Sequence, residues 1–274
     1  MTTTGTPNPQ AVGELYDGFD EMDVLHFGYW PDAADQAPIE VAAARLTDLV
    51  AENVEAAPGL RLIDVGCGIG SPAVRIAERN GADITGITIS AKQVARATAL
   101  ASVAGLADQV RFEHGDAMCM PFADGSFDAA YALESIIHMD RPSALREISR
   151  VIKPGGRVVL TDLYAREPAA SEGGLMHFLA DAWLMSPLVG LDEYPALAAA
   201  AGLAVVAVTD ISEQVLWRTL QVVAKQLREN VKPLVPDQIV DQLETGYDAP
   251  PADLPALLEN AKEMGCLLVV LQKP

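Results

Sequence analysis

The run LIDVGCGIGSP, residues 62–72, combines an acidic side chain with glycines at alternate positions. An apolar stretch leads into Asp64, and a segment with helical character follows the glycines. Alternate glycines let a backbone turn tightly and approach a ligand closely where a helix begins. Dinucleotide-binding loops carry GxGxxG, and Ser71 stands where the third glycine of that pattern belongs. The run predicts a ligand-binding strand–loop–helix turn, with a tight turn that binds nothing as the alternative.

Two later apolar runs end in side chains that can move a proton. The run ALESIIHM, residues 132–139, places Glu134 and His138 at the end of one predicted strand, and Asp162 ends the next. Ligands of open parallel sheets bind at the carboxyl edge of the strands, so these groups are expected near the glycine loop. The ordinary pKa of histidine, about 6.5, suits a general base at neutral pH.

The elements that position these groups are predicted from residue 60 onward, where strand and helix patterns alternate. This alternation predicts an α/β fold whose seven-stranded, mostly parallel sheet has helices on both faces. A Ser90–Gln93 capping box and Gly105 mark the ends of one helix. The predicted strands are 61–65, 83–88, 110–114, 127–133, 156–161, 203–210 and 265–271, and the predicted helices are 11–19, 38–55, 72–80, 91–104, 143–151 and 193–201.

Two stretches interrupt the alternation and predict a lid. Helical patterns punctuated by glycine or proline fill both, at the end of the sheet where a pocket is expected. We therefore expect one domain over residues 1–274. Its predicted parts are an N-terminal cap (1–59), a cofactor-binding half (60–163), lid insertions (164–191 and 212–262) and closing strands (192–211 and 263–274).

Composition excludes several classes of partner. The 274 residues hold 38 Asp plus Glu against 19 Lys plus Arg, a net charge of −19. Such a chain repels nucleic-acid phosphates and anionic membrane surfaces. No stretch is apolar for long enough to span a bilayer, and the first ten residues lack the features of a secretory signal. Three scattered cysteines, and histidines without metal-ligand spacing, predict a cytoplasmic protein without a structural metal.

Three motifs resemble those of the class I S-adenosylmethionine-dependent methyltransferases, in the family's order. LIDVGCGIG resembles the cofactor loop, HGDAMCMPFADGSFD (114–128) the motif whose acidic residue binds adenine, and REISRVIKPGGRVVLTD (146–162) the helix and fifth strand. The resemblance covers nearly all of the chain and implies a Rossmann-like sheet with S-adenosylmethionine as cofactor. It implies cofactor contacts from Asp64, Gly66, Cys67, Gly68, Asp116, Ala117 and Leu133.

The end of the second strand departs from the family's commonest pattern. Many members hold the ribose with an acidic residue there, but this chain has Thr88. A subgroup with cyclopropane synthases and natural-product methyltransferases has a similar Thr–Ile–Ser–x–x–Gln pattern, which implies that Ser90 and Gln93 bind the ribose. The capping box alone also accounts for both residues. In the aromatic-rich segment 15–32, Tyr16 and the stretch His26–Trp30 are expected to cover the cofactor, whose sulfonium an aromatic ring attracts. Anchoring of the N-terminal helix to the core is the alternative.

The same segment resembles antibiotic-type natural-product methyltransferases, including the rebeccamycin-type sugar O-methyltransferases. Those enzymes have two adjacent histidines after strand four and an Asp after strand five. Here His138 and Asp162 are kept, and Ile137 replaces the first histidine. Methylation of a sugar or other hydroxyl needs a group that takes the proton, so His138 is the expected base and Asp162 its partner. A buried core histidine and a strand-end cap are the alternatives.

The acceptor is expected to be a bulky small molecule that meets Glu134, Ile137 and His177. An amine can lose its proton after attack, so the missing histidine leaves N-methylation of a specialised metabolite as the alternative function. Residues 1–60 hold 11 acidic side chains and one basic, which favours a neutral or cationic acceptor. The apolar faces of the lid helices make a homo-oligomer plausible. A nicotinamide oxidoreductase is disfavoured by the glycine loop and by Thr88, and a non-catalytic binding protein by the intact motifs.

Overall fold

The computed structural model describes residues 5–19, 22–32, 34–166, 180, 183–216, 218–219 and 264–274. The predicted lid insertions, 164–191 and 212–262, lie largely outside these residues, and His177 lies outside them entirely. The fold is therefore described for the cap, the binding half and the closing strands.

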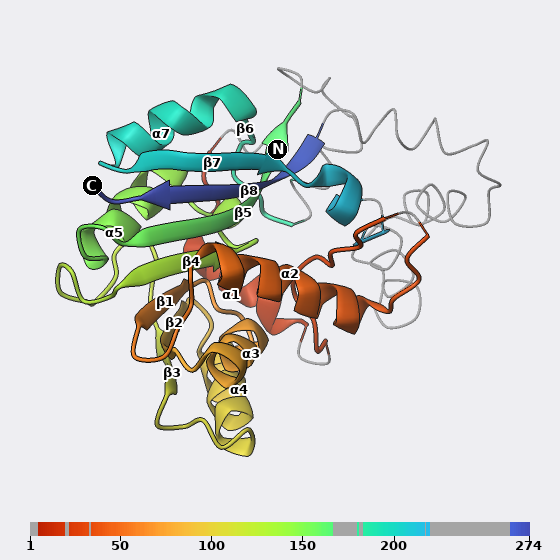
Figure 1. Cartoon of the computed structure of the whole chain (residues 1–274), viewed down its shortest axis with the longest axis vertical. Coiled ribbons are helices and arrows are strands. Elements are labelled where there is room, and N and C mark those ends of the chain that lie inside the picture. The colour runs from red at the N-terminus through yellow and green to blue at the C-terminus, as the bar shows by residue number, and fades with distance from the viewer. Residues whose placement is uncertain are drawn as a thin grey trace.

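The described strands form one sheet in the order β3–β2–β1–β4–β5–β8–β7 (Figure 1). Only β8 runs antiparallel to its neighbours, β5 and β7, which confirms the predicted seven-stranded, mostly parallel sheet. An additional two-residue strand, β6 (Val189–Gly190), pairs with the end of β5. The seven strands are β1 (Arg61–Val65), β2 (Asp83–Thr88), β3 (Val110–His114), β4 (Ala129–Leu133), β5 (Arg157–Ala165), β7 (Ala204–Asp210) and β8 (Met264–Gln272).

Helices cover both faces of the sheet, and each face has its own apolar cluster. In α2 the apolar side chains recur at helical spacing and bury Leu46 and Val50 against one face. On the other face α5 buries Leu145 and Ile148. The helices of the first face are α2 (Ile39–Asn53), α3 (Ser71–Asn80) and α4 (Ala91–Val103), and those of the second are α5 (Arg141–Val151) and α7 (Tyr194–Ala200).

Local hydrogen bonds explain where the element bounds differ from the prediction. Helix α5 begins two residues early because the Asp140 side chain accepts from the backbone N–H of Ser143 and caps the helix there. Helix α3 is preceded by Gly70 in the left-handed region (φ 82°), so Gly70 rather than Ser71 is the N-cap. Strand β5 runs to Ala165 because it pairs with β8 along its whole length.

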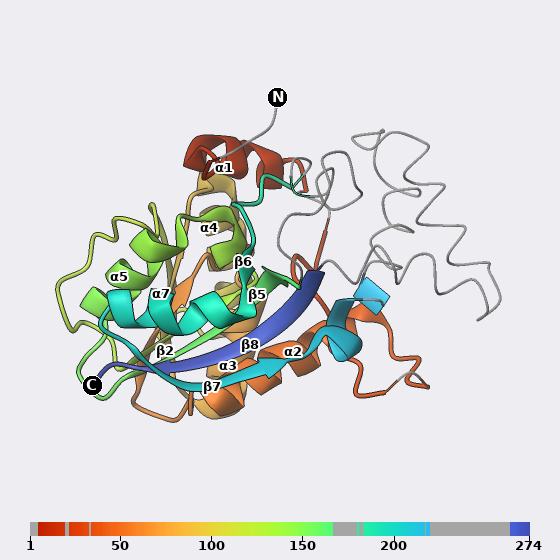
Figure 2. The same cartoon turned by 90° about the horizontal axis from the view of Figure 1, so that it is seen from above.

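The strand order reverses between β1 and β4, so the loops after these strands diverge at the carboxyl edge. Helix α1 (Pro9–Asp17) lies across this edge (Figure 2), where the Ser90 hydroxyl donates to the Asp17 carboxylate. A crevice covered by α1 is therefore built between β1, β2 and β4. In the described part of the chain, no helix has both the length and the apolar character that a membrane crossing needs.

Candidate active site

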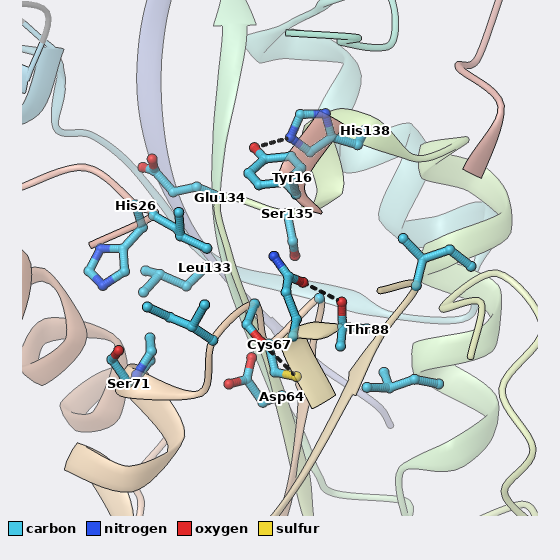
Figure 3. Close-up of a pocket in the computed structure, with 18 of the residues that line it drawn as sticks. Tyr16, His26, Asp64, Cys67, Ser71, Thr88, Leu133, Glu134, Ser135 and His138 are labelled. Carbon is cyan, nitrogen blue, oxygen red and sulfur yellow. Dashed lines mark hydrogen bonds between the residues drawn. The ribbon is translucent and has the colours of Figure 1, made fainter. Parts of the chain in front are cut away.

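A cavity of about 320 Å³ lies at this edge, and its wall comes from α1, α2 and the segments that follow β1 to β4 (Figure 3). Most of the residues predicted from the sequence lie in this wall. They are Tyr16, Asp64, Gly66, Cys67, Gly68, Gln93, Asp116, Ala117, Leu133, Glu134 and His138.

The glycine loop makes a tight cradle at the floor of the cavity. The backbone N–H groups of Gly66 and Cys67 both donate to the Ile87 carbonyl, at 2.9 and 3.0 Å. Gly66 has a φ of 77°, and a Cβ placed on it would lie 2.3 Å from the Cβ of Ser135. No larger residue fits there, because the loop backbone packs closely against the segment that follows β4.

The Asp64 carboxyl group lies at the end of β1 with one oxygen, Oδ2, that has no hydrogen-bond partner among the described residues. Burial raises the pKa of Asp64 to about 7, although the nearby Tyr131 phenol offsets part of the rise. A buried carboxyl oxygen without a partner is costly, and a polar donor in the cavity would relieve that cost. The site thus fits a ligand with an amino group at this position.

Gln93 and Ser90, the two residues predicted to bind ribose, have different hydrogen-bond partners at the end of β2. The Thr88 hydroxyl donates to Gln93 Oε1 at 2.6 Å, and Gln93 lies in the cavity wall. Ser90 caps α4 by accepting from the Gln93 backbone N–H at 3.1 Å, and its hydroxyl donates to Asp17. The described cavity wall does not include Ser90, whose side chain caps α4 and bonds to Asp17, and its ribose contact stays a prediction.

Asp116 and Ala117 form a turn after β3 at the other end of the cavity. Asp116 Oδ1 accepts from the backbone N–H of Met118 at 2.8 Å, and all three residues line the cavity. One carboxylate oxygen therefore holds the turn.

His138 closes the short 3-10 helix Ile136–His138 that follows β4. Its Nδ1 lies 3.0 Å from the Leu184 carbonyl, which can only accept, so Nδ1 carries the proton. Its Nε2, 2.8 Å from the Tyr16 hydroxyl, must then accept. Burial lowers the pKa of His138, which keeps the ring neutral at pH 7. The site thus holds a neutral imidazole with its lone pair directed at a phenol.

Tyr16 extends from α1 into the cavity beside this ring (Figure 3). The two rings meet edge to face, with centroids 5.3 Å apart. Burial and the neighbouring Glu134 raise the pKa of the Tyr16 phenol, so it keeps its proton and donates to His138. An acceptor hydroxyl that approaches His138 therefore meets a phenol already bonded to the base.

Glu134 also lies in the cavity wall, in the left-handed region at φ 55°. Its backbone N–H donates to Thr161 Oγ1 at 3.0 Å, and its Oε2 accepts from the Phe27 backbone N–H at 3.1 Å. Burial raises the pKa of the Glu134 carboxyl to about 8.

Asp162 was expected beside His138, but it is fully buried in an ion pair. Arg141 donates to its two carboxylate oxygens at 2.6 and 3.0 Å, and the Tyr194 hydroxyl donates to it as well. Both nitrogens of His138 bond to other groups, so the predicted pairing of Asp162 with His138 is wrong. Ile137 is also buried, and neither Ile137 nor Asp162 belongs to the described cavity wall.

The cavity wall also includes His26, from the stretch expected to cover the cofactor, and Ser135. His26 donates from Nδ1 to the Phe27 carbonyl at 2.9 Å, and its Nε2 lies 3.4 Å from Thr47 Oγ1. Burial lowers the pKa of His26 to about 4, so the ring is neutral. Ser135 was not among the predicted site residues. Its hydroxyl donates to the Val65 carbonyl.

A Rossmann-like sheet with a glycine cradle at its carboxyl edge is an arrangement that binds nucleotide cofactors. Residues 63–160 match the family model described as a methyltransferase domain. The 27-O-demethylrifamycin SV methyltransferase of Amycolatopsis mediterranei (strain S699) is 41% identical over 215 residues, 76% of this chain and 78% of that protein. The chain belongs to the class I S-adenosylmethionine-dependent methyltransferases.

Two solved structures share the architecture. The [4+2]-cyclase SpnF is 32% identical, with a TM-score of 0.79 over 98% of both chains. Geranyl diphosphate C-methyltransferase from Streptomyces coelicolor A3(2), solved with Mg²⁺, geranyl diphosphate and S-adenosyl-L-homocysteine, has a TM-score of 0.77 over 98% of this chain and 99% of that one. At 20% identity the second likeness concerns the fold alone. The chain is an S-adenosylmethionine-dependent methyltransferase.

Proposed function

We propose that this enzyme methylates a hydroxyl group of a small specialised metabolite, with His138 as the general base. One observation carries the proposal: His138 is neutral, and its Nε2 lone pair bonds to Tyr16 inside the cavity. A hydroxyl is too weakly acidic to attack unaided, and a base at this position removes that obstacle. The name of the rifamycin relative, a methyltransferase of a 27-O-demethyl compound, favours oxygen over nitrogen as the acceptor atom.

We propose the following orientation for the cofactor in the described cavity. Asp64 Oδ2, which lacks a partner, would accept from the amino group of the methionine end, beside the cradle of Gly66, Cys67 and Gly68. Gln93 would hold the ribose, since Thr88 fixes its amide. The turn after β3 would hold the adenine through Asp116 and Ala117, and Leu133 and Tyr16 would cover the remaining walls.

The chain's own residues then have two tasks. When bound, S-adenosylmethionine supplies a methyl group already activated on a sulfonium. The cavity wall aligns the acceptor oxygen with that methyl group for in-line displacement. Tyr16 accepts the acceptor's proton as its own phenolic proton passes to Nε2 of His138, while Nδ1 keeps its bond to Leu184. The Leu184 carbonyl stabilises the imidazolium, because it faces the ring from the other side.

The acceptor is proposed to be neutral or cationic. Asp23 and Glu40 lie in the cavity wall, and both side chains are exposed. Asp23 is paired with Arg96, and Arg75 in the same wall is paired with Asp48. The described wall therefore adds no positive charge without a partner to attract a phosphorylated acceptor. A sugar hydroxyl is the finer possibility, but the resemblance to sugar enzymes drew on His138 and Asp162 together, and only His138 lines the cavity. We therefore propose a hydroxyl acceptor without restricting it to a sugar.

A second candidate function follows from the likeness to the [4+2]-cyclase SpnF. At 32% identity over 98% of both chains, the same fold could bind a polyunsaturated metabolite and promote its cyclisation. In such a reaction the acceptor gains no methyl group, and His138 has no proton to take.

Variants of the Tyr16–His138 pair test the mechanism. His138→Ala should lower kcat about 10²–10⁴-fold with the dissociation constant of S-adenosylhomocysteine unchanged within about threefold. Tyr16→Phe should lower kcat less, because His138 remains. The His138 pKa lies below its ordinary value, so kcat should stay constant from pH 8 down to about 6.5 and fall only below that. An unchanged kcat in His138→Ala would rule out the base.

A further inference from the structure

We infer that Glu134 is the final proton acceptor of the reaction, and that the charge of the bound cofactor sets its ionisation. Glu134 is ionised while the cationic S-adenosylmethionine is bound, and it gains a proton when the neutral S-adenosylhomocysteine is left. This inference rests on the proposed function for the source of that proton, the acceptor hydroxyl. It concerns a carboxyl group to which the mechanism above gives no role.

The surroundings of Glu134 hold its carboxyl group at the cavity wall. The backbone at φ 55° lies in a region that non-glycine residues rarely adopt, a cost that marks functional sites. The Phe27 backbone N–H fixes Oε2, and Oε1 lies 3.8 Å from Sγ of Cys266. A thiol is a weak donor, so Oε1 is the oxygen free to take or release a proton.

The groups that face Glu134 leave it without a fixed counter-ion. From α1 comes the protonated Tyr16, from β8 the Cys266 thiol, and from β5 Asp162, whose charge Arg141 balances. His138 and His26 are neutral rings in the same wall. Among the described residues, no lysine or arginine forms an ion pair with Glu134. A cation in the cavity would therefore be its main electrostatic partner.

The size of the effect follows from the burial of this carboxyl group. With a pKa of about 8, Glu134 is about nine-tenths protonated at pH 7 in the free enzyme. A neighbouring opposite charge lowers a carboxyl pKa by about 1 to 3. Binding of the cationic cofactor should therefore release about 0.4 to 0.9 proton from Glu134 at pH 7.

The same charge change gives the acceptor's proton a destination. During transfer the acceptor O–H bond breaks and an O–CH₃ bond forms, while the electron pair of the broken C–S bond stays on sulfur. The proton reaches Tyr16 and His138 first. With the positive charge gone, the Glu134 carboxylate regains its affinity for a proton and takes it from this pair, because Tyr16 adjoins both groups. His138 is thereby neutral again for the next turnover.

Proton release on binding tests the inference without any acceptor. Calorimetric titrations at pH 7, in buffers of different ionisation enthalpy, give the protons released by S-adenosylmethionine and by S-adenosylhomocysteine. The two ligands share the adenosine and amino-acid parts and differ in the charge at sulfur. S-adenosylmethionine should release about 0.4 to 0.9 proton more in the wild type, and the difference should vanish in Glu134→Gln. Equal release in the wild type would overturn the inference.

Two further measurements separate Glu134 from other groups. Asp64 also titrates near neutral pH, so a difference that persists in Glu134→Gln would assign the effect to another carboxyl and refute the claim for Glu134. In His138→Ala the difference should remain, because the proposed base is neutral in both complexes. If Glu134→Gln fails to fold, the wild type decides: the affinity for S-adenosylmethionine relative to S-adenosylhomocysteine should rise up to about tenfold per pH unit between pH 6 and 8. A constant ratio contradicts the inference.

Discussion

Substitution of Asp162 by Asn separates a structural role from a catalytic one. The side chain is fully buried and receives two hydrogen bonds from Arg141 and one from Tyr194. Asn keeps the shape but removes the negative charge. Burial lowers the pKa of Arg141, but the Asp162 carboxylate raises it by more, so the wild-type guanidinium is charged. In the variant this guanidinium, whose side chain is 3% exposed, is left in the interior without its counter-ion.

The expected cost follows from the geometry of the pair. Breaking a buried ion pair by removing one partner costs about 3–5 kcal/mol, because the remaining charge is left unpaired. For a chain of this size, at about 2 °C per kcal/mol, the Tm should fall by about 6–10 °C. The triple variant Arg141→Met, Asp162→Leu, Tyr194→Phe removes the three polar side chains. Among the described residues it leaves only the Leu163 N–H and the Pro187 carbonyl without these partners. Its Tm should recover most of the loss, because it buries no unpaired charge.

Thermal unfolding followed by circular dichroism measures the Tm, and methyl transfer at 20 °C measures the kcat of the folded protein. Asp162→Asn should keep kcat within about threefold of the wild type. An unchanged Tm together with a hundredfold loss of kcat would refute this reasoning. That result would return Asp162 to the catalytic role expected from the sequence.

Three further changes test the cofactor site. Asp116→Ala should raise the dissociation constant of S-adenosylhomocysteine about tenfold by calorimetry, as loss of a charged hydrogen bond does; an unchanged value removes the adenine contact. Gly66→Ala should lower both Tm and cofactor affinity, because its Cβ would lie 2.3 Å from Ser135, whereas Gly59→Ala, at a similar φ but with nothing within 4 Å, should leave the affinity unchanged. In the ligand-free enzyme the Asp64 pKa is raised to about 7, so folding stability should fall as the pH rises from about 4 to 7. Asp64→Asn should flatten that slope in thermal melts, and an identical slope would refute the pKa.

The fold followed from sequence because its signals are local. Periodicity, caps and glycines at helix ends located the seven main strands along the chain, because each unit of strand and helix has its own sequence pattern. The two-residue strand β6 left no pattern because only Val189 and Gly190 pair with β5. The early start of α5 depends on one side chain, that of Asp140, which accepts from the Ser143 backbone N–H. Other nearby polar residues could also cap a helix, so the sequence did not single out Asp140.

The site was predictable where the backbone sets it and less so where side chains choose between partners. The glycine loop and the ends of β2 and β4 bring Asp64, Gln93 and His138 to one cavity as expected. Asp162 follows the same rule of position, but Arg141, 21 residues earlier, turns it into the interior. Nothing in the spacing of these two residues showed that they would pair. The Tyr16–His138 bond spans 122 residues and depends on how α1 crosses the edge of the sheet, which periodicity does not encode.

The most direct test of hydroxyl methylation is mass spectrometry of the acceptor after incubation with S-adenosylmethionine. A panel should include 27-O-demethylrifamycin SV, hydroxylated macrolides, amines of similar size and phosphorylated acceptors. The account predicts an acceptor that gains one methyl group on oxygen, in a reaction that His138→Ala slows about a hundredfold or more. A product isomeric with its substrate, or methylation at nitrogen that proceeds equally well in His138→Ala, would contradict it.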